Sequence, residues 1–125
     1  MTMATPQKIG DRGERLAADY LEHKGYRLLA HNWRFKKAEV DLIAQDGRMI
    51  VFVEVKTRSY NLYGPPDLAV NHKKEAMLTA AAHAWIDENK YEGEIRFDVI
   101  SILFKENKTT EINHIEDAFF WGLEF

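Results

Sequence analysis

Two β-prone runs separated by Asp46-Gly47 constrain the fold of this chain more than any other feature. Asp-Gly between such runs is a strong signal for a two-residue hairpin turn, so we expect a β-hairpin over residues 39–58. With the turn at Asp46-Gly47, Gln45 pairs with Arg48, and Asp41 then lies opposite Phe52. The hairpin is therefore the predicted centre of a β-sheet.

The two predicted strands each divide into an apolar and a charged set of side chains. Successive side chains of a strand point to opposite faces of the sheet. One face would be entirely apolar, with Val40, Leu42, Ala44, Val51, Val53 and Val55. The other would display Glu39, Asp41, Glu54 and Lys56. A register shift by an even number of residues leaves this division unchanged.

One interpretation of the charged set is a binding site for a cation. Two carboxylates about 5 Å apart repel by roughly 3 kcal/mol at an effective dielectric constant of ~20. An ordinary half-exposed strand with surface glutamates and a lysine accounts for the same alternation. The pattern by itself does not distinguish the two interpretations.

Composition indicates one domain over residues 1–125, of an ordinary globular kind. The chain has no cysteine, which excludes disulfides and thiolate zinc sites and fits a reducing compartment. It has no signal-peptide-like start and no apolar run long enough to cross a bilayer. We therefore expect a soluble, cytoplasmic protein with no membrane partner.

Charge is unevenly distributed along the chain. Residues 1–75 hold 13 lysines and arginines against 10 acidic residues, whereas residues 76–125 hold 4 against 10. An anionic partner such as nucleic acid would therefore contact the N-terminal portion, where the hairpin lies.

Hydrophobic periodicity predicts the remaining elements. They are a helix over 11–24, a strand over 26–35, a helix over 72–89 and strands over 95–104 and 110–115, with a loose leader at 1–9 and an aromatic tail at 116–125. The tail is expected to dock on the domain or on a partner protein. The aromatic residues of 26–35 are expected to pack in a core rather than stack on bases, and the loop over 59–67 is expected to border the site.

Glu14 is the acid of the first predicted helix that borders its apolar stripe. A favourable interaction with the helix dipole explains this position, and so does a role as a ligand reaching the acidic face of the hairpin.

Asp41, followed after twelve residues by Glu54-Val55-Lys56, resembles the motif of the PD-(D/E)XK nuclease superfamily. A narrower resemblance, to the bacterial YraN family, covers roughly residues 8–119. It is carried by Gly10-Asp11-Arg12-Gly13-Glu14, Asn32-Trp33-Arg34, Glu39-Val40-Asp41-Leu42-Ile43-Ala44, Phe52-Val53-Glu54-Val55-Lys56-Thr57-Arg58 and Arg96-Phe97-Asp98-Val99. This group is classed as endonuclease-like and akin to archaeal Holliday junction resolvases. Ala38 stands where the family usually has glycine.

The resemblance implies an α/β, restriction-endonuclease-like fold, with a central mixed sheet of a three-stranded meander plus crossover strands, flanked by helices. It implies a Mg²⁺ or Mn²⁺ site formed by Asp41, Glu54, the Val55 carbonyl and Glu14. Lys56 would activate the attacking water, and Glu39 would be a supporting group or a spare ligand. Our candidates for phosphate contacts are Arg34, Arg58, Lys73 and Lys74.

The function implied is a metal-dependent endonuclease acting on DNA, on branched or repair intermediates, as a homodimer if it makes paired cuts. The alternative is a non-catalytic nucleic-acid-binding or protein-interaction module on the same fold. A fold that has lost its metal would be favoured if the acids were paired with basic neighbours and Lys56 pointed away.

Overall fold

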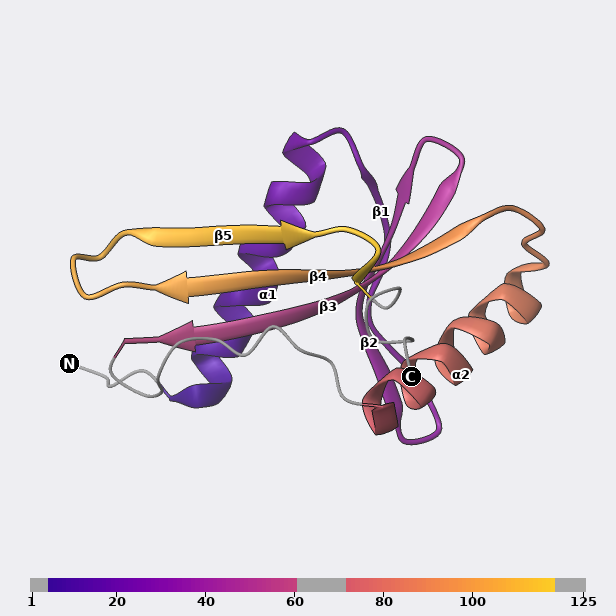
Figure 1. Ribbon diagram of the computed structural model, residues 1–125, viewed down its shortest axis with the longest axis horizontal. Helices are drawn as coiled ribbons and strands as arrows, with labels where there is room; N and C mark the ends of the chain where they lie inside the picture. The colour runs from indigo at the N-terminus through magenta and orange to yellow at the C-terminus, as the bar shows by residue number, and fades with distance from the viewer. Residues whose placement is uncertain (1–4, 61–71, 119–125) are drawn as a thin grey trace.

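The computed structural model describes residues 5–60 and 72–118, which form two helices and five strands (Figure 1). In chain order they are α1 (Pro6–His23), β1 (Arg27–Phe35), β2 (Ala38–Asp46), β3 (Met49–Ser59), α2 (His72–Asn89), β4 (Ile95–Phe104) and β5 (Thr110–Ile115).

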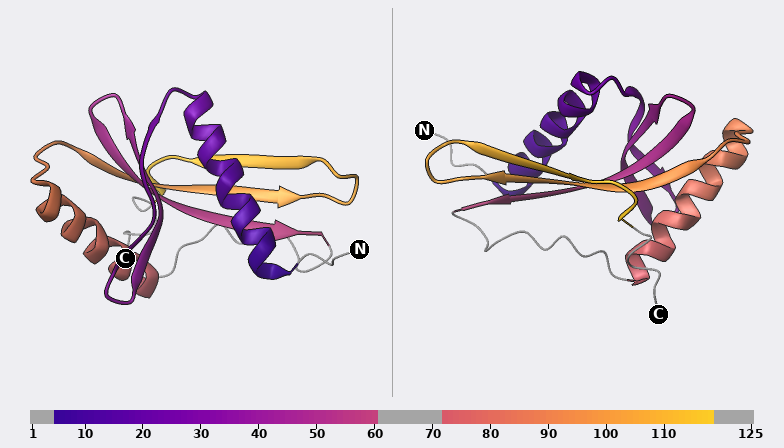
Figure 2. Two further views of the ribbon diagram at one scale, coloured as in Figure 1. Left: turned by 180° about the vertical axis from the view of Figure 1, so that it is seen from behind. Right: turned by 45° about the horizontal axis from the view of Figure 1, so that its top comes forward.

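The strands form one mixed sheet in the order β1-β2-β3-β4-β5. β3 and β4 are parallel, with α2 in the connection between them, and the other neighbouring pairs are antiparallel. α1 packs on one face and α2 on the other, as the views of Figure 2 show from two sides. The predicted α/β, restriction-endonuclease-like architecture is confirmed.

The hairpin of β2 and β3 is buried on both faces, not on one as expected. On one face lies a hydrophobic cluster beneath Ala17 and Leu21 of α1, which we call the α1 cluster. It contains Leu42, Ala44, Val51 and Val53, with Val55 at its border. Ile43 and Phe52 are buried on the other side, in a second cluster that we call the α2 cluster. This cluster includes Leu78, Ala81, Ala82 and Trp85 of α2. Val40 was expected on the same face as Leu42, but it packs on the α2 side instead. The charged residues of the hairpin therefore lie beside a second core.

The predicted register of the hairpin was wrong by two residues. Asp46 pairs with Met49, so the turn residues are Gly47 and Arg48. Gly47 has φ +61 at the first turn position, which is where type II′ hairpin turns take glycine. Because the shift is even, the paired residues 42–46 and 49–53 keep the faces expected for them. Continued past the last pair, this register aligns Asp41 with Glu54 instead of Phe52.

Helix and strand limits largely match the prediction, and α2, β4 and β5 match it at both ends. The prediction of a loose leader over residues 1–9 was wrong for residues 6–9, because α1 begins at Pro6. Thr5 caps the helix, and its Oγ1 accepts the Lys8 N–H at 3.2 Å. Residues 119–125 of the aromatic tail and 61–67 of the expected loop lie outside the described residues. Neither α1 nor α2 is long and apolar enough to cross a membrane.

The aromatic residues of β1 belong to the core, as expected. Trp33 and Phe35 pack against the α2 cluster, and Tyr26, just before β1, is buried in the α1 cluster.

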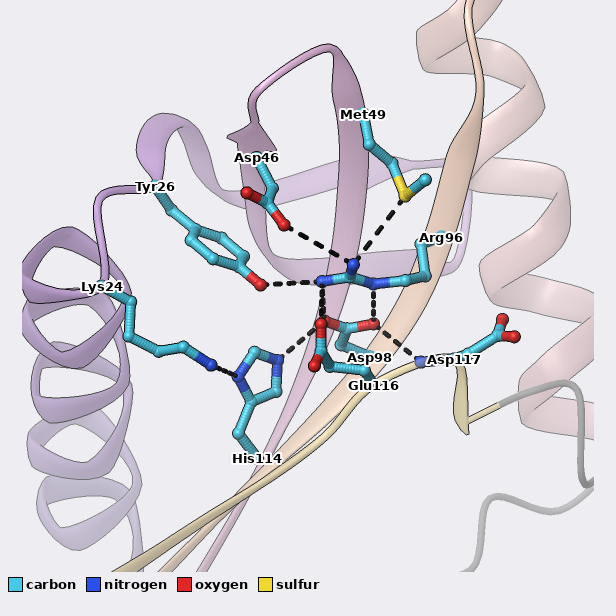
Figure 3. Close-up of polar contacts among 9 residues, drawn as sticks. All are labelled: Lys24, Tyr26, Asp46, Met49, Arg96, Asp98, His114, Glu116 and Asp117. Atoms are coloured by element: carbon cyan, nitrogen blue, oxygen red, sulfur yellow. Dashed lines mark hydrogen bonds and ion pairs between the residues drawn. The ribbon is translucent and has the colours of Figure 1, made fainter.

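A buried ionic network ties β4 to its surroundings (Figure 3). Arg96 Nε and Nη2 donate to the two carboxylate oxygens of Asp98, each at 2.8 Å, and Nη2 also donates to the Tyr26 hydroxyl at 2.8 Å. The Asp117 N–H donates to Asp98 Oδ1 at 3.0 Å. The carboxylate of Asp98 is fully buried, so each of these bonds replaces a lost contact with water.

His114 completes this network from β5. Its Nε2 lies 2.7 Å from Asp98 Oδ2, and its Nδ1 lies 3.0 Å from Lys24 Nζ. A lysine ammonium only donates, so Nδ1 accepts and Nε2 carries the proton given to Asp98. Burial acts to raise the pKa of Asp98, but the bonds from His114, Arg96 and the Asp117 N–H outweigh it and hold that pKa below its usual value. The network thus joins the end of α1 to β4 and β5.

Candidate active site

The sheet forks beside the candidate acids. Pairing between β2 and β3 runs from Asp46–Met49 to Leu42–Val53. Beyond that pair, residues 38–40 of β2 continue to pair with β1, while residues 54–59 of β3 pair with β4. Figure 1 shows the two branches parting, with the β1–β2 turn directed toward the start of α2. Asp41 and Glu54 are the first residues past the last pair, one on each branch.

Asp41 bridges the fork. Its Oδ2 accepts the backbone N–H of Val55 at 2.8 Å, taking the place of a strand carbonyl where the β2–β3 ladder ends. This bond fixes the carboxylate of Asp41 close to the Glu54 side chain. The hydrogen bond thus satisfies the backbone N–H of Val55 at the end of the ladder and fixes the orientation of the Asp41 carboxylate.

A pocket of about 380 Å³, which we call the fork pocket, opens between the diverging strands and α2. Its lining residues are Lys37, Ala38, Glu39, Asp41, Glu54, Lys73, Lys74, Met77 and Leu78. Glu54 is only 7% exposed there, and Lys74 Nζ lies 2.5 Å from its Oε1. Three predicted acids and two predicted phosphate-binding lysines therefore line one cavity.

The two acids at the fork are electrostatically coupled. Burial, and then the charge of Glu54, raise the pKa of Asp41 from 3.8 to about 8, although the bond from Val55 and the charge of Lys74 act in the opposite direction. A carboxyl group in this setting keeps its proton at neutral pH unless further positive charge is present. The repulsion expected from the sequence is thus a property of the folded protein.

Glu14 approaches the same region from α1. Burial, and next to it the charges of Glu39 and Asp11, raise the pKa of Glu14, and Glu54 contributes in the same direction. α1 lies very close to β3 here, because a Cβ built on Gly13 would be 2.0 Å from Thr57 Oγ1. Glycine at position 13 lets the helix bring Glu14 toward the fork.

Asn32 is a site residue that the sequence analysis missed. With its amide oriented to satisfy its neighbours, Nδ2 donates to Glu14 Oε1 at 3.0 Å and to Glu39 Oε1 at 3.3 Å. Its backbone is left-handed, with φ +50 within β1. Asparagine is rare in strands and tolerant of this conformation, so an Asn inside a β-prone run was the available signal.

The other predicted residues are placed as follows. Lys56 is half-buried on β3, two residues past Glu54 and so on the same side of the strand. Arg58 Nη1 donates to the Thr57 carbonyl at 2.8 Å, and neither Lys56 nor Arg58 lines the fork pocket. Arg34 is largely exposed and pairs with Glu39 at 2.9 Å. The Val55 carbonyl remains a predicted ligand.

Ala38 does not distort the approach to the site. Its φ lies outside the left-handed region that favours glycine, and it sits in strand pairing opposite Phe35. Its methyl group is buried at the edge of the fork pocket. The backbone therefore does not require glycine at this position.

Within residues 5–60 and 72–118, no group of three His, Asp or Glu side chains forms a metal centre. The donor set nevertheless fits one kind of ion. Mg²⁺ is usually held by one or two carboxylates together with water and substrate phosphates. The hard oxygens of Asp41 and Glu54 suit such an ion, and their mutual repulsion is what a divalent cation relieves.

A forked mixed sheet carrying two coupled acids at its branch point, with a helix on each face, defines a restriction-endonuclease-like domain. The model of the Uncharacterised protein family UPF0102 matches residues 13–102, and the chain belongs to this family, the YraN-type group indicated by its motifs.

Curated relatives match nearly the whole chain. A "UPF0102 protein" of Trichlorobacter lovleyi is 46% identical over 115 residues, covering 90% of this chain and 91% of its own. One from Christiangramia forsetii is 42% identical over 119 residues, covering 95% and 99%. One from Thermodesulfovibrio yellowstonii is 45% identical over 113 residues, covering 90% and 96%. Their names state the family and no activity.

Proposed function

We propose that this protein is a metal-dependent endonuclease that hydrolyses phosphodiester bonds in nucleic acid, with DNA as its substrate. The observation that carries the proposal is that Asp41 and Glu54 lie close together across the fork and line one pocket. Burial and mutual repulsion keep the pKa of Asp41 near 8, so full ionisation of the pair calls for added positive charge. Active sites are where such perturbed acids concentrate.

Asp41 and Glu54 would hold Mg²⁺ or Mn²⁺, with the Val55 carbonyl as a further ligand. Glu14 would add a third carboxylate from α1, oriented by the hydrogen bond that it accepts from Asn32. When bound, such an ion supplies Lewis acidity and lowers the pKa of a coordinated water.

The residues of the chain would perform the other tasks. Asp41, held by the Val55 N–H, gives up its proton as positive charge enters the fork pocket. Lys56 would orient the attacking water and stabilise the charge that develops on the phosphoryl oxygens as the phosphodiester bond breaks. Lys73 and Lys74 would contact backbone phosphates, which positions a strand without reading its sequence. Arg34 and Arg58 would contact phosphates farther from the cut, and two chains acting together would make paired cuts.

A second candidate function, a non-catalytic nucleic-acid-binding or protein-interaction module, is favoured by one contact. Lys74 forms an ion pair with Glu54, so one acid of the proposed metal site already has a cationic partner without a metal ion. Both candidates include binding, so cleavage has to separate them.

The test is a cleavage assay on labelled branched, single-stranded and duplex DNA, with Mn²⁺ or with EDTA. The wild type should give Mn²⁺-dependent products from at least one substrate, and Asp41→Asn and Glu54→Gln should give none while keeping the wild-type circular dichroism spectrum. Undiminished cleavage by either variant contradicts the proposal. Binding without cleavage of any substrate by the wild type supports the non-catalytic module.

A further inference from the structure

A second, apolar pocket adjoins the fork pocket. This apolar pocket has a volume of about 340 Å³ and is lined by Phe35, Lys36, Lys37, Ala38, Met77 and Ala80. Three of these residues, Lys37, Ala38 and Met77, also line the fork pocket. The two cavities therefore meet along a common wall. The fork pocket is lined mostly by charged residues, whereas the surface of the second pocket is apolar.

The turn between β1 and β2 and the N-terminal half of α2 form the walls of the apolar pocket. Phe35 pairs with Ala38 at the end of the two strands, so Lys36 and Lys37 are the turn residues. Lys36 has φ +56, and its ammonium lies 5.2 Å from the centre of the Phe35 ring. Met77 is half-buried against the same cluster as Phe35. An aromatic ring and a thioether thus face a cavity whose rim carries two lysines.

We propose that the apolar pocket binds an unpaired nucleobase of the strand whose phosphate lies in the fork pocket. This inference rests on the nuclease function proposed above and specifies its substrate class. Each base has a flat π-face that stacks on an aromatic side chain whatever the sequence, and lysines beside it match the charge of the strand. A base inside a continuous duplex is already paired and stacked, so it cannot enter without being extruded. The preferred substrate is therefore a single strand or the unpaired nucleotides of a flap or branch point.

The charge of the rim favours a nucleic acid over an apolar peptide in this pocket. Lys36 and Lys37 stand at its edge, and Lys73 follows on the fork-pocket side. Among the described residues, acidic side chains line the fork pocket, where a metal ion is proposed to bind, and none lines the apolar pocket. A strand could thus place its backbone along the lysines and one base against Phe35.

The test compares the affinity of the full-length protein, in EDTA, for a fluorescein-labelled single strand and for the same strand with abasic sites, by fluorescence anisotropy. Abasic sites keep every phosphate and remove the bases, so the ratio of the two affinities isolates base binding. We expect the wild type to bind the strand with bases about tenfold more tightly, as stacking of one base predicts.

Two variants should weaken base binding in different ways. Ala80→Glu places a carboxylate in the apolar pocket from an exposed helical position, and Phe35→Leu keeps an apolar side chain but removes the ring. Both should reduce the tenfold ratio to about twofold or less. Ala76→Glu is the matched control, because it makes the same change at an exposed position of α2 that lines neither pocket, and it should keep the wild-type ratio.

Equal affinity of the wild type for the two strands overturns the inference, and so does an unchanged ratio in both Ala80→Glu and Phe35→Leu. The binding assay and the cleavage assay test the two proposals separately, so either proposal can be refuted without the other. A wild type that distinguishes the two strands but never cuts retains the base pocket and loses the nuclease function, whereas one that cuts without distinguishing them does the reverse.

Discussion

Lys74 Nζ lies 2.5 Å from Glu54 Oε1, beside the Asp41 carboxylate on the opposite branch of the fork. The ammonium group supplies part of the positive charge that the two acids call for, and it lowers the pKa of Asp41. A divalent cation on Glu54 would have to share this carboxylate with Lys74 or displace it. The lysine is therefore both a counter-ion of the metal-free site and a competitor for the metal.

Replacing Lys74 should strengthen metal binding. We expect Lys74→Ala to bind Mn²⁺ several-fold more tightly than wild type in calorimetry without nucleic acid, because like charges in a partly buried site repel strongly. Lys73→Ala is the control, since Lys73 lines the same pocket and the ion pair with Glu54 is made by Lys74. Equal Mn²⁺ affinities of wild type and Lys74→Ala would show that the ammonium does not compete.

Asp41 should make stability depend on pH in the metal-free protein. Its pKa is about 8 in the folded chain, against an ordinary value of 3.8, so the folded state holds a proton on Asp41 between these pH values that the unfolded state releases. The free energy of unfolding should therefore fall as pH rises from about 4 to about 8. Asp41→Asn does not ionise, so near pH 8.5 it should be more stable than wild type by ~1–3 kcal/mol, with little difference near pH 4.

Urea denaturation in EDTA at several pH values measures this effect. Asp19→Asn, at an exposed position of α1, is the control and should follow the wild-type profile. If wild type and Asp41→Asn gave parallel profiles, the coupling between Asp41 and Glu54 would not be present in solution.

Gly13 and Gly10 should respond in opposite ways to the same substitution. A Cβ at Gly13 would lie 2.0 Å from Thr57 Oγ1 and 2.7 Å from its Cγ2, whereas a Cβ at Gly10 meets nothing within 4 Å. Gly13→Ala should lower the free energy of unfolding by ~1–3 kcal/mol through displacement of α1. Gly10→Ala should raise it by ~0.5–1 kcal/mol, because alanine favours a helix interior. Thermal and urea unfolding test both, and a stabilised Gly13→Ala would contradict the close approach of α1 to β3.

Asp98 should be among the most sensitive positions for stability. Asp98→Asn leaves Arg96 and His114 without their buried partner, and breaking a buried ion pair on one side costs ~3–5 kcal/mol. Asp117→Asn is the control, because Asp117 contacts Asp98 through its backbone N–H and its own side chain is exposed. Because the pKa of Asp98 is below its usual value, its contribution is present above about pH 4 and is lost as pH falls through that lowered value. Equal unfolding midpoints in urea for the two variants at pH 7 would refute the structural role of the network.

The elements of the fold followed from the sequence to within a few residues. The helical spacing of small apolar residues in 72–89 gave both ends of α2, and the β-prone runs gave β4 and β5. These signals are local, because hydrophobic periodicity reports which side of an element is buried. Asp41, Glu54 and Lys56 remain predicted site residues, and the structure places Asp41 and Glu54 together in the fork pocket. A change of register by two residues does not alter which side chains share a face of paired strands.

The contacts that make the site were decided by tertiary structure. The turn chemistry of Gly47 set the register that aligns Asp41 with Glu54, and divergence of the strands left the Val55 N–H for the Asp41 side chain. Lys74 reaches Glu54 only because α2 covers this face of the sheet.

Sequence by itself thus determined which residues are acidic, basic or apolar on each element, and the resemblance of its motifs to a known family indicated the class of fold and the candidate acids. Only the tertiary structure decided that the hairpin is buried on both faces, that Asn32 links Glu14 to Glu39, and that an apolar pocket adjoins the acidic one. The physical reason is that periodicity and propensity act over a few neighbouring residues. Burial of a charge, its pKa and its partners depend on segments that are far apart in the chain and meet only when the core packs.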